Sequence, residues 1–153
     1  MVMAETREID TRLGRQAVDL DKVIHFPRGI IGFEGRKDFT LLQIKPGAPF
    51  LVLQSMDDPG LGLLVADPYG FMPEYTIKVG DAEQKILKIN KREELAVLVT
   101  VAIPPGKPEQ TVISLTGPIL INHGAKIGIQ APQTELKGPT KILLNTADLT
   151  PIQ

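Results

Sequence analysis

The chain of 153 residues contains no cysteine and no tryptophan. Without cysteine the protein has no disulfide, no thiolate ligand for a metal and no cysteine nucleophile. The same absence gives no reason to place the protein in an oxidising compartment, and we expect it in the cytoplasm.

An excess of charge of either sign is also missing. Lys and Arg together number 17 and Asp and Glu 18, which gives a net charge of −1. This balance provides no electrostatic basis for binding nucleic acid directly or an anionic membrane surface. No stretch is long and apolar enough to predict a membrane-spanning helix. We therefore expect neither nucleic acid nor membrane as a partner.

Residues for nucleophilic catalysis are few. The chain has two histidines, His25 and His123, and two serines, Ser55 and Ser114. Ser55 and His123 form a triad on paper with Asp57, but no Gly-X-Ser-X-Gly motif supports it. The sequence predicts a protein that is not an enzyme.

Metal and cofactor motifs are equally scarce. The segment 57–60, Asp-Asp-Pro-Gly, holds adjacent carboxylates, whereas calcium loops spread their oxygen ligands over about a dozen residues. A solvated β-turn is the simpler interpretation. No glycine-rich phosphate loop is present, so we predict no metal and no cofactor. A solvated helix face explains the basic residues Lys85, Lys88, Lys91 and Arg92.

Short runs rich in Val, Ile and Leu, separated by Gly, Pro and Asp, predict a mainly β structure. An N-terminal hairpin is expected from Glu5 to Asp19, with its turn at Leu13-Gly14-Arg15. Six further strands are predicted at Phe39–Ile44, Phe50–Met56, Gly62–Ala66, Tyr75–Val79, Leu95–Ile103 and Thr111–Leu115.

Two short helical segments are predicted. Asp81 is placed to cap a helix on which Ala82, Ile86 and Ile89 share one face. Asp67-Pro68 favours a second, shorter turn with Pro at its first position. The pattern indicates one domain over residues 1–153, a small antiparallel β-barrel-like domain with one or two short helices, whose tail from about residue 132 is undefined.

One apolar run is interrupted by residues that constrain the backbone. In Phe26-Pro27-Arg28-Gly29-Ile30-Ile31-Gly32-Phe33, proline fixes φ and the glycines permit positive φ. A tight turn after a strand is one interpretation. The other is a rigid surface that presents Ile30, Ile31 and Phe33 to another protein.

This run is the first of four segments that occur in a characteristic order. Together they resemble the bacterial flagellar assembly factor FliW family, from about Thr11 to Asn122. The three further segments are Pro49–Ser55, Asp67-Pro68-Tyr69 with Tyr75, and Leu115–Asn122. The chain departs from the family pattern at Asp67, at Gly117 and in the segment after Asn122.

The resemblance implies a small barrel-like domain that binds proteins. One expected partner is flagellin, recognised through its C-terminal helical part. The other is CsrA, an RNA-binding regulator that represses flagellin translation. By partner exchange the protein would antagonise CsrA when flagellin has been exported. Acidic residues near the N-terminus would then repel RNA phosphates from CsrA: Glu5, Glu8, Asp10, Asp19 and Asp21.

Aromatic and apolar side chains in constrained segments are the candidate partner contacts, because interfaces favour such anchors. Core packing is the alternative for each, and the favoured one for Phe33 and Tyr75. Exposure is favoured for Phe71 and Met72, which lie between Gly70 and Pro73. The predicted partner-binding residues are Ile30, Phe33, Tyr69, Phe71, Met72 and Tyr75.

Three other functions stay open at this point. They are a flagellin-binding chaperone without a regulatory role, a nucleic-acid-binding barrel of the OB type, and a small hydrolase that uses Ser55 or Ser114. The even charge and the lack of a long apolar helix favour a monomer.

Overall fold

A computed structural model describes residues 5–134 and 140–144 of the chain. Its strands are β1 Thr6–Thr11, β2 Gly14–Asp19, β3 Ile24–His25, β4 Asp38–Gln43, β5 Phe50–Ser55, β6 Gly62–Ala66, β7 Leu95–Ala102, β8 Thr111–Asn122, β9 Ile127–Gln130 and β10 Lys141–Leu144. The helical elements are α1 Asp81–Leu87 and the 3-10 turns η1 Leu20–Lys22, η2 Pro68–Gly70, η3 Arg92–Glu94 and η4 Pro108–Gln110.

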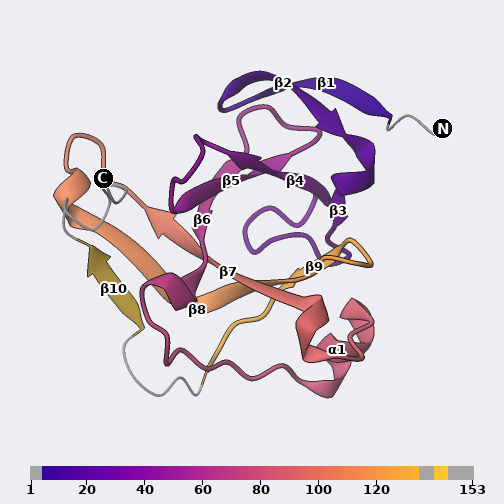
Figure 1. Cartoon of the computed structure of the whole chain (residues 1–153), viewed down its shortest axis with the longest axis vertical. Helices are drawn as coiled ribbons and strands as arrows, with labels where there is room; N and C mark the ends of the chain where they lie inside the picture. The colour runs from indigo at the N-terminus through magenta and orange to yellow at the C-terminus, as the bar shows by residue number, and fades with distance from the viewer. Residues whose placement is uncertain (1–4, 135–139, 145–153) are drawn as a thin grey trace.

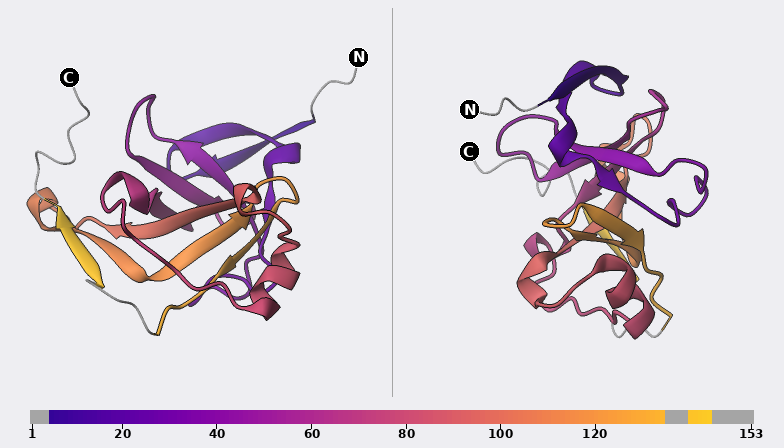
Figure 2. Two further views of the ribbon diagram at one scale, coloured as in Figure 1. Left: turned by 60° about the horizontal axis from the view of Figure 1, so that its bottom comes forward. Right: turned by 90° about the vertical axis from the view of Figure 1, so that its right-hand side faces the viewer.

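The strands from β3 to β9 close into a barrel (Figure 1). Neighbours pair in antiparallel fashion, except for a parallel contact between His25 of β3 and Ile127 of β9, and β9 also pairs with β8. β10 extends the sheet outside the barrel along β8. β1 and β2 form a separate hairpin, which lies at the opposite end of the molecule from α1 (Figures 1 and 2). The predicted mainly β, barrel-like fold is confirmed.

The barrel encloses the first hydrophobic core. Phe26 and Phe39 are fully buried there and pack edge to face, with ring centroids 5.3 Å apart. Gly128 of β9 lies against the Phe26 ring, and a Cβ at that position would come within 2.6 Å of it. The ring thus occupies the space that a side chain on β9 would need.

A second apolar layer covers the outer face of β7, β8 and β9. It is formed by η2, by residues 71–80, which we call the strap, and by α1. Ile77 of the strap and Leu87 of α1 pack against Val97 of β7 and Leu120 of β8. The polypeptide between β6 and β7 therefore forms an outer layer on the barrel.

Most predicted elements are present, with boundaries shifted by a residue or two. The N-terminal hairpin, β4, β5, β6 and β7 all match their predicted segments. The Asp67-Pro68 turn is η2, in which the Asp67 carboxylate accepts a hydrogen bond of 2.9 Å from the Tyr69 N–H. β8 continues beyond the predicted Leu115 to Asn122.

The predicted strand Tyr75–Val79 is wrong. This segment is part of the strap and pairs with no strand in the described chain. Instead, the side-chain amide of Gln133 accepts a hydrogen bond from the Lys78 N–H at 2.8 Å and donates one to the Lys78 C=O at 3.0 Å. One side chain thus satisfies both backbone groups that a neighbouring strand would satisfy.

The predicted capping of α1 is also wrong in detail. Gly80 is the N-cap and makes no side-chain hydrogen bond, while Asp81 is the first helical residue. Ala82 is exposed, and the buried position of the helix is Leu87. Strands β9 and β10 were not expected from the sequence. Within the described residues, no helix is long and apolar enough to cross a membrane.

Candidate functional site

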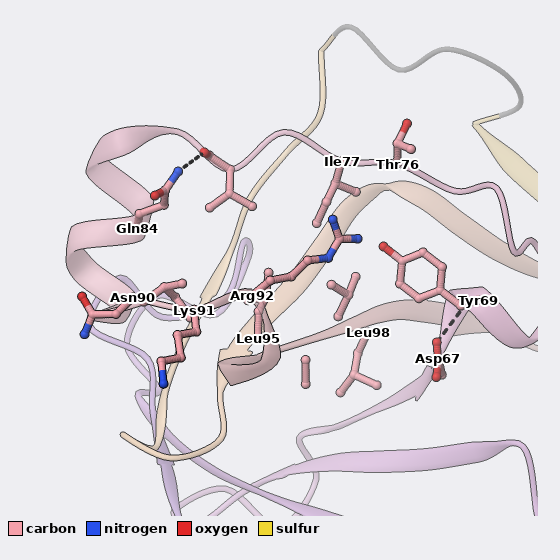
Figure 3. Close-up of a pocket in the computed structure, with 14 residues that line it drawn as sticks. Asp67, Tyr69, Thr76, Ile77, Gln84, Asn90, Lys91, Arg92, Leu95 and Leu98 are labelled. Atoms are coloured by element: carbon pink, nitrogen blue, oxygen red, sulfur yellow. Dashed lines mark hydrogen bonds between the residues drawn. The ribbon is translucent and has the colours of Figure 1, made fainter.

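A groove of about 620 Å³ lies between the outer layer and the first half of β7 (Figure 3). Its volume is within the range of ordinary ligand sites. Leu95, Val97 and Leu98 of β7 form its apolar floor. Ile77 of the strap forms part of the opposite wall, and Tyr69 closes one end. The groove exists because β6 leaves the sheet at Asp67, so the strap passes β7 without pairing with it.

Aromatic residues hold the outer wall in place. The Tyr75 hydroxyl donates a hydrogen bond of 2.6 Å to the buried Leu115 C=O, and burial raises the pKa of Tyr75 to about 12. Tyr69 packs on Tyr75 with centroids 5.9 Å apart. Phe71 stacks on Phe50 at 6.2 Å, with the ring planes 21° apart. The tyrosine at the groove is therefore held by packing on a hydrogen-bonded neighbour.

Basic side chains stand at the groove. The Arg92 side chain extends across it toward Tyr69, and the nearby positive charge opposes the rise in the Tyr69 pKa that burial causes (Figure 3). Within residues 5–134 and 140–144, neither Lys91 nor Arg92 forms an ion pair. The nearby Glu94 accepts hydrogen bonds from the Asn90 and Lys91 N–H groups at 2.8 and 2.7 Å. These backbone bonds lower the pKa of Glu94.

The apolar turn after β3 forms a second surface. Gly29 has a φ of +65°, and a Cβ there would lie 2.5 Å from the backbone of Glu34. The Gly32 N–H donates to the Glu34 carboxylate at 2.9 Å, which lowers the pKa of Glu34. Ile31 and Phe33 project from this turn with 58% and 44% of their surface exposed. The turn is a rigid apolar projection and does not line the groove.

Comparison with known proteins identifies the family. The family model described as FliW protein matches residues 8–144. A flagellar assembly factor FliW from Nitratidesulfovibrio vulgaris is 64% identical over 141 residues, which cover 92% of this chain and 82% of the relative. One from Syntrophomonas wolfei is 38% identical over 122 residues, covering 80% and 78%.

The chain belongs to the FliW family. A crystal structure of the flagellar assembly factor FliW has the same fold, with a TM-score of 0.84 and 30% identity over 91% of this chain and 97% of the other. The chain is accordingly a flagellar assembly factor, and the resemblance inferred from its four segments is confirmed.

The six residues predicted to bind partners divide between two surfaces of this FliW domain. Tyr69, Phe71, Met72 and Tyr75 lie together in η2 and the strap, while Ile30 and Phe33 belong to the apolar turn. Their role in binding a partner stays a prediction.

The six predicted partner-binding residues also differ in how deeply they are buried. Tyr75 and Ile30 are 5% and 2% exposed, so both belong to the core, as expected for Tyr75 and contrary to the idea that the turn presents Ile30. Phe33 is exposed, where core packing was favoured. Phe71 and Met72, expected to be exposed, are half-buried against the second core because the strap folds back onto β7 and β8. Phe33 is the exposed anchor of the set, while Tyr69, Phe71 and Met72 are all half-buried.

The groove residues outside this set were missed by sequence reasoning. Arg92 was interpreted as part of a solvated helix face, although α1 ends at Leu87 and Arg92 begins η3. The left-handed Lys88, with a φ of 56°, turns the chain after the helix. A signal for this was the change from helical spacing to the polar run of residues 90–94.

Ser55 and both histidines have structural partners. The Ser55 hydroxyl accepts hydrogen bonds from the Asp57 and Asp58 N–H groups at 3.1 and 3.0 Å, which shapes the turn after β5. His123 contacts the Glu93 C=O through Nε2 at 2.9 Å. His25 is exposed and contacts Asp38 at 2.8 Å. The described residues contain no cluster of three or more His, Asp or Glu able to hold a metal ion.

The acidic hairpin predicted to repel RNA is partly neutralised. Arg15 of β2 lies 3.0 Å from Asp10 and 3.5 Å from Glu8, and these contacts, the hydrogen bond with Asp10 foremost, raise the pKa of Arg15. All three side chains are well exposed, so each pair contributes little to stability.

Proposed function

We propose that this member of the FliW family binds flagellin in the cytoplasm and antagonises CsrA by partner exchange. In this scheme flagellin occupies the protein while it accumulates, and its export frees the protein to bind CsrA and relieve repression of flagellin translation. The protein acts as a monomer and by binding alone, without catalysis, metal or cofactor.

The observation that carries the proposal is the groove. It joins an apolar floor at Leu95 and Val97 to an aromatic end at Tyr69 and to Arg92, which has no ion pair in the described chain. Protein interfaces combine such features, because apolar anchors supply affinity and charges select the partner. In a family of flagellar assembly factors, flagellin is the natural candidate for this surface.

The test is a calorimetric titration of the purified protein with flagellin and CsrA, first separately and then in competition. We expect each to bind, and flagellin to displace CsrA. Tyr69→Ala and Arg92→Glu should each weaken binding by tenfold or more, about 1.4 kcal/mol. Lys22→Ala, an exposed cation in η1 away from the groove, is the matched control and should bind as the parent does.

Each other outcome has a defined meaning. Binding of flagellin without CsrA would reduce the function to that of a chaperone and refute the regulatory part. Binding of neither would overturn the proposal. Normal binding by both groove variants together with loss in Phe33→Ala would move the partner site to the apolar turn.

A further inference from the structure

Strand β7 is fully paired on one edge only. Toward β8 its pairing begins at Leu95, but β6 meets it only at Val99 and Thr100. Beyond Ala66 the chain turns away into η2. The first half of β7 therefore presents an open strand edge to the groove.

The hydrogen-bond register identifies the open atoms. His123 N–H donates to the Glu94 C=O at 3.3 Å, which makes Glu94 and His123 a hydrogen-bonded pair in line with the β7–β8 register. Because such pairs alternate along an antiparallel ladder, the even-numbered residues of β7 bond to β8. Leu95 and Val97 direct their N–H and C=O groups the other way, toward the groove.

Three of these backbone groups have no hydrogen-bond partner among the described residues. The Leu95 N–H donates to the Arg92 C=O within η3. For the Val97 N–H, the Val97 C=O and the Leu95 C=O, no hydrogen bond exists with any residue in 5–134 or 140–144. Exposed edges of this kind template the addition of another strand, and proteins normally protect them.

The surroundings of the edge define what would bind there. The groove floor is apolar, and Tyr69 at its end offers a flat, hydrogen-bonding anchor. Of the charged residues that line it, Asp67 already accepts a hydrogen bond from the Tyr69 N–H, whereas Lys91 and Arg92 have no ion pair among the described residues. The site is therefore complementary to an apolar segment that carries a carboxylate.

We propose that an extended segment of a protein partner adds to the open edge of β7 as a further strand and places a carboxylate against Arg92. Backbone hydrogen bonds to Val97 and Leu95 would supply part of the affinity, and alternate side chains would contact the floor. This inference rests on the proposed function in taking the groove as a partner site, and it specifies the conformation and charge of what binds.

An extended segment fits this edge better than a helix does. A bound helix satisfies its own backbone groups and would leave those of Val97 and Leu95 without partners in a desolvated interface, which costs affinity. An added strand supplies an acceptor for the Val97 N–H and donors for the Val97 and Leu95 carbonyls, at the spacing of the edge itself. The contact at β7 is thus expected to be distinct from recognition of a helical part of the same partner.

Amide hydrogen exchange of the full-length parent protein, followed by NMR at single residues, tests this directly. In the free protein the Val97 amide should exchange at least about tenfold faster than that of Ala96, which bonds to β8. Saturation with flagellin or with CsrA, whichever binds, should slow exchange at Val97 by about 100-fold and at Ala96 far less. Ala96 is the internal control.

A synthetic peptide makes the test independent of those two proteins. The probe is a ten-residue peptide of alternating Thr and Val with a central Glu, N-methylated along one edge to prevent self-association. It should protect Val97, whereas a peptide methylated at every residue should not. Arg92→Glu should weaken binding of the Glu peptide about tenfold, and a Lys peptide should restore it.

A proline variant examines the donor itself. Val97→Pro removes the N–H that faces the groove and spares the β7–β8 bonds, and proline is tolerated at such edge positions. The affinity of Val97→Pro for the bound segment should be about tenfold lower than that of Val97→Ala, which removes the apolar side chain and keeps the N–H. Should Val97→Pro fail to fold, exchange in the parent protein decides.

The outcomes separate this inference from the proposed function. Tight binding of flagellin or CsrA with no protection of Val97 would overturn strand addition and leave the proposed function intact. Protection by the peptide alone would support strand addition while refuting the named partners. If protection of Val97 grows with the protein's own concentration and sedimentation shows a dimer, the edge pairs with a second copy of this chain. That result would overturn the proposal. No protection under any condition also overturns it.

Discussion

The apolar turn after β3 allows a direct test, because two of its glycines both have a positive φ but differ in what surrounds them. Gly29 and Gly32 have φ values of +65° and +90°. A Cβ on Gly32 would meet nothing within 4 Å, whereas one on Gly29 would lie 2.5 Å from the Glu34 Cα and 2.7 Å from its carbonyl oxygen. Substitution by alanine therefore carries the cost of a positive φ at both sites, and the cost of steric overlap with Glu34 at Gly29 alone.

The magnitudes follow from these surroundings. Placing a residue with a Cβ at positive φ costs about 1–2 kcal/mol, which applies to both Gly29→Ala and Gly32→Ala. Gly29→Ala must also relieve contacts more than about 1 Å shorter than the usual 3.5–4.0 Å between carbon atoms. The obstacle is backbone, not a flexible side chain, so overpacking adds about 1–3 kcal/mol. We expect a loss of about 2–5 kcal/mol for Gly29→Ala and 1–2 kcal/mol for Gly32→Ala.

Equilibrium unfolding in urea, followed by circular dichroism because the chain lacks tryptophan, measures both values. The midpoint should fall for both variants, and further for Gly29→Ala, at a constant m value. Equal losses, within about 0.5 kcal/mol, would refute the close approach of Gly29 to Glu34. A loss confined to Gly32→Ala would refute the reasoning on the whole turn.

Three further predictions concern two residues that hold the outer layer, Tyr75 and Asn122. Tyr75→Phe removes a buried hydroxyl bonded to the Leu115 C=O and should cost about 1–3 kcal/mol, against less than 0.5 for Tyr69→Phe, in the same urea assay. Because the folded-state pKa of Tyr75 is raised to about 12, its stabilising effect is complete below pH 10 and declines as pH rises toward 12. The free energy of unfolding, measured from pH 10 to 12, should therefore fall in the parent protein and fall less in Tyr75→Phe. An equal fall in both proteins would mean that another group causes it. Asn122→Asp should destabilise by about 2–4 kcal/mol, since the fully buried amide donates to two carbonyls at the end of α1, while Asn90→Asp, at an exposed site, should stay within about 0.5. Equal effects of the two Asn→Asp changes would contradict that role for Asn122.

Local turn chemistry explains why much of the barrel was predictable. Lys45-Pro46-Gly47 and Asp57–Gly60 carry residues that turns require, and they bound β4, β5 and β6 closely. Gly47 has a φ of +80°, which glycine adopts readily in a turn. Where a strand is bounded by such turns, its extent follows from the sequence alone.

The strap shows where that reasoning fails. Tyr75, Ile77 and Val79 alternate with polar residues as in a strand, and their side chains do pack inward. Alternation reports which face is buried and cannot report whether a neighbouring strand exists. Here the partner of Lys78 is the side chain of Gln133, more than fifty residues away, which no local pattern indicates.

The division of the predicted anchors has a similar cause. Aromatic residues are commonly buried, which favoured a core position for Phe33, while Ile30 was expected to be presented to a partner. The positive φ of Gly29 and Gly32 reverses this, because the turn directs Ile30 into the barrel and Phe33 outward. Composition identified the turn as special, but only the backbone path decides which of its side chains a partner can reach.

The groove depends on a turn that the sequence predicts, Asp67-Pro68, and on an open strand edge in β7 that it does not predict. Asp67-Pro68 was expected to form a turn, and it does so because Asp67 caps the Tyr69 N–H and Pro68 lacks a donor with which to continue β6. Had β6 continued, its next residues would have covered Val97 and Leu95. The residues that end β6 therefore expose the edge of β7 and also carry Tyr69 to the end of the groove beside it. The local signal Asp67-Pro68 thus creates an open edge on a strand about thirty residues further along the chain. Changing Pro68 should therefore alter the hydrogen exchange of the Val97 amide as well as the structure of the turn.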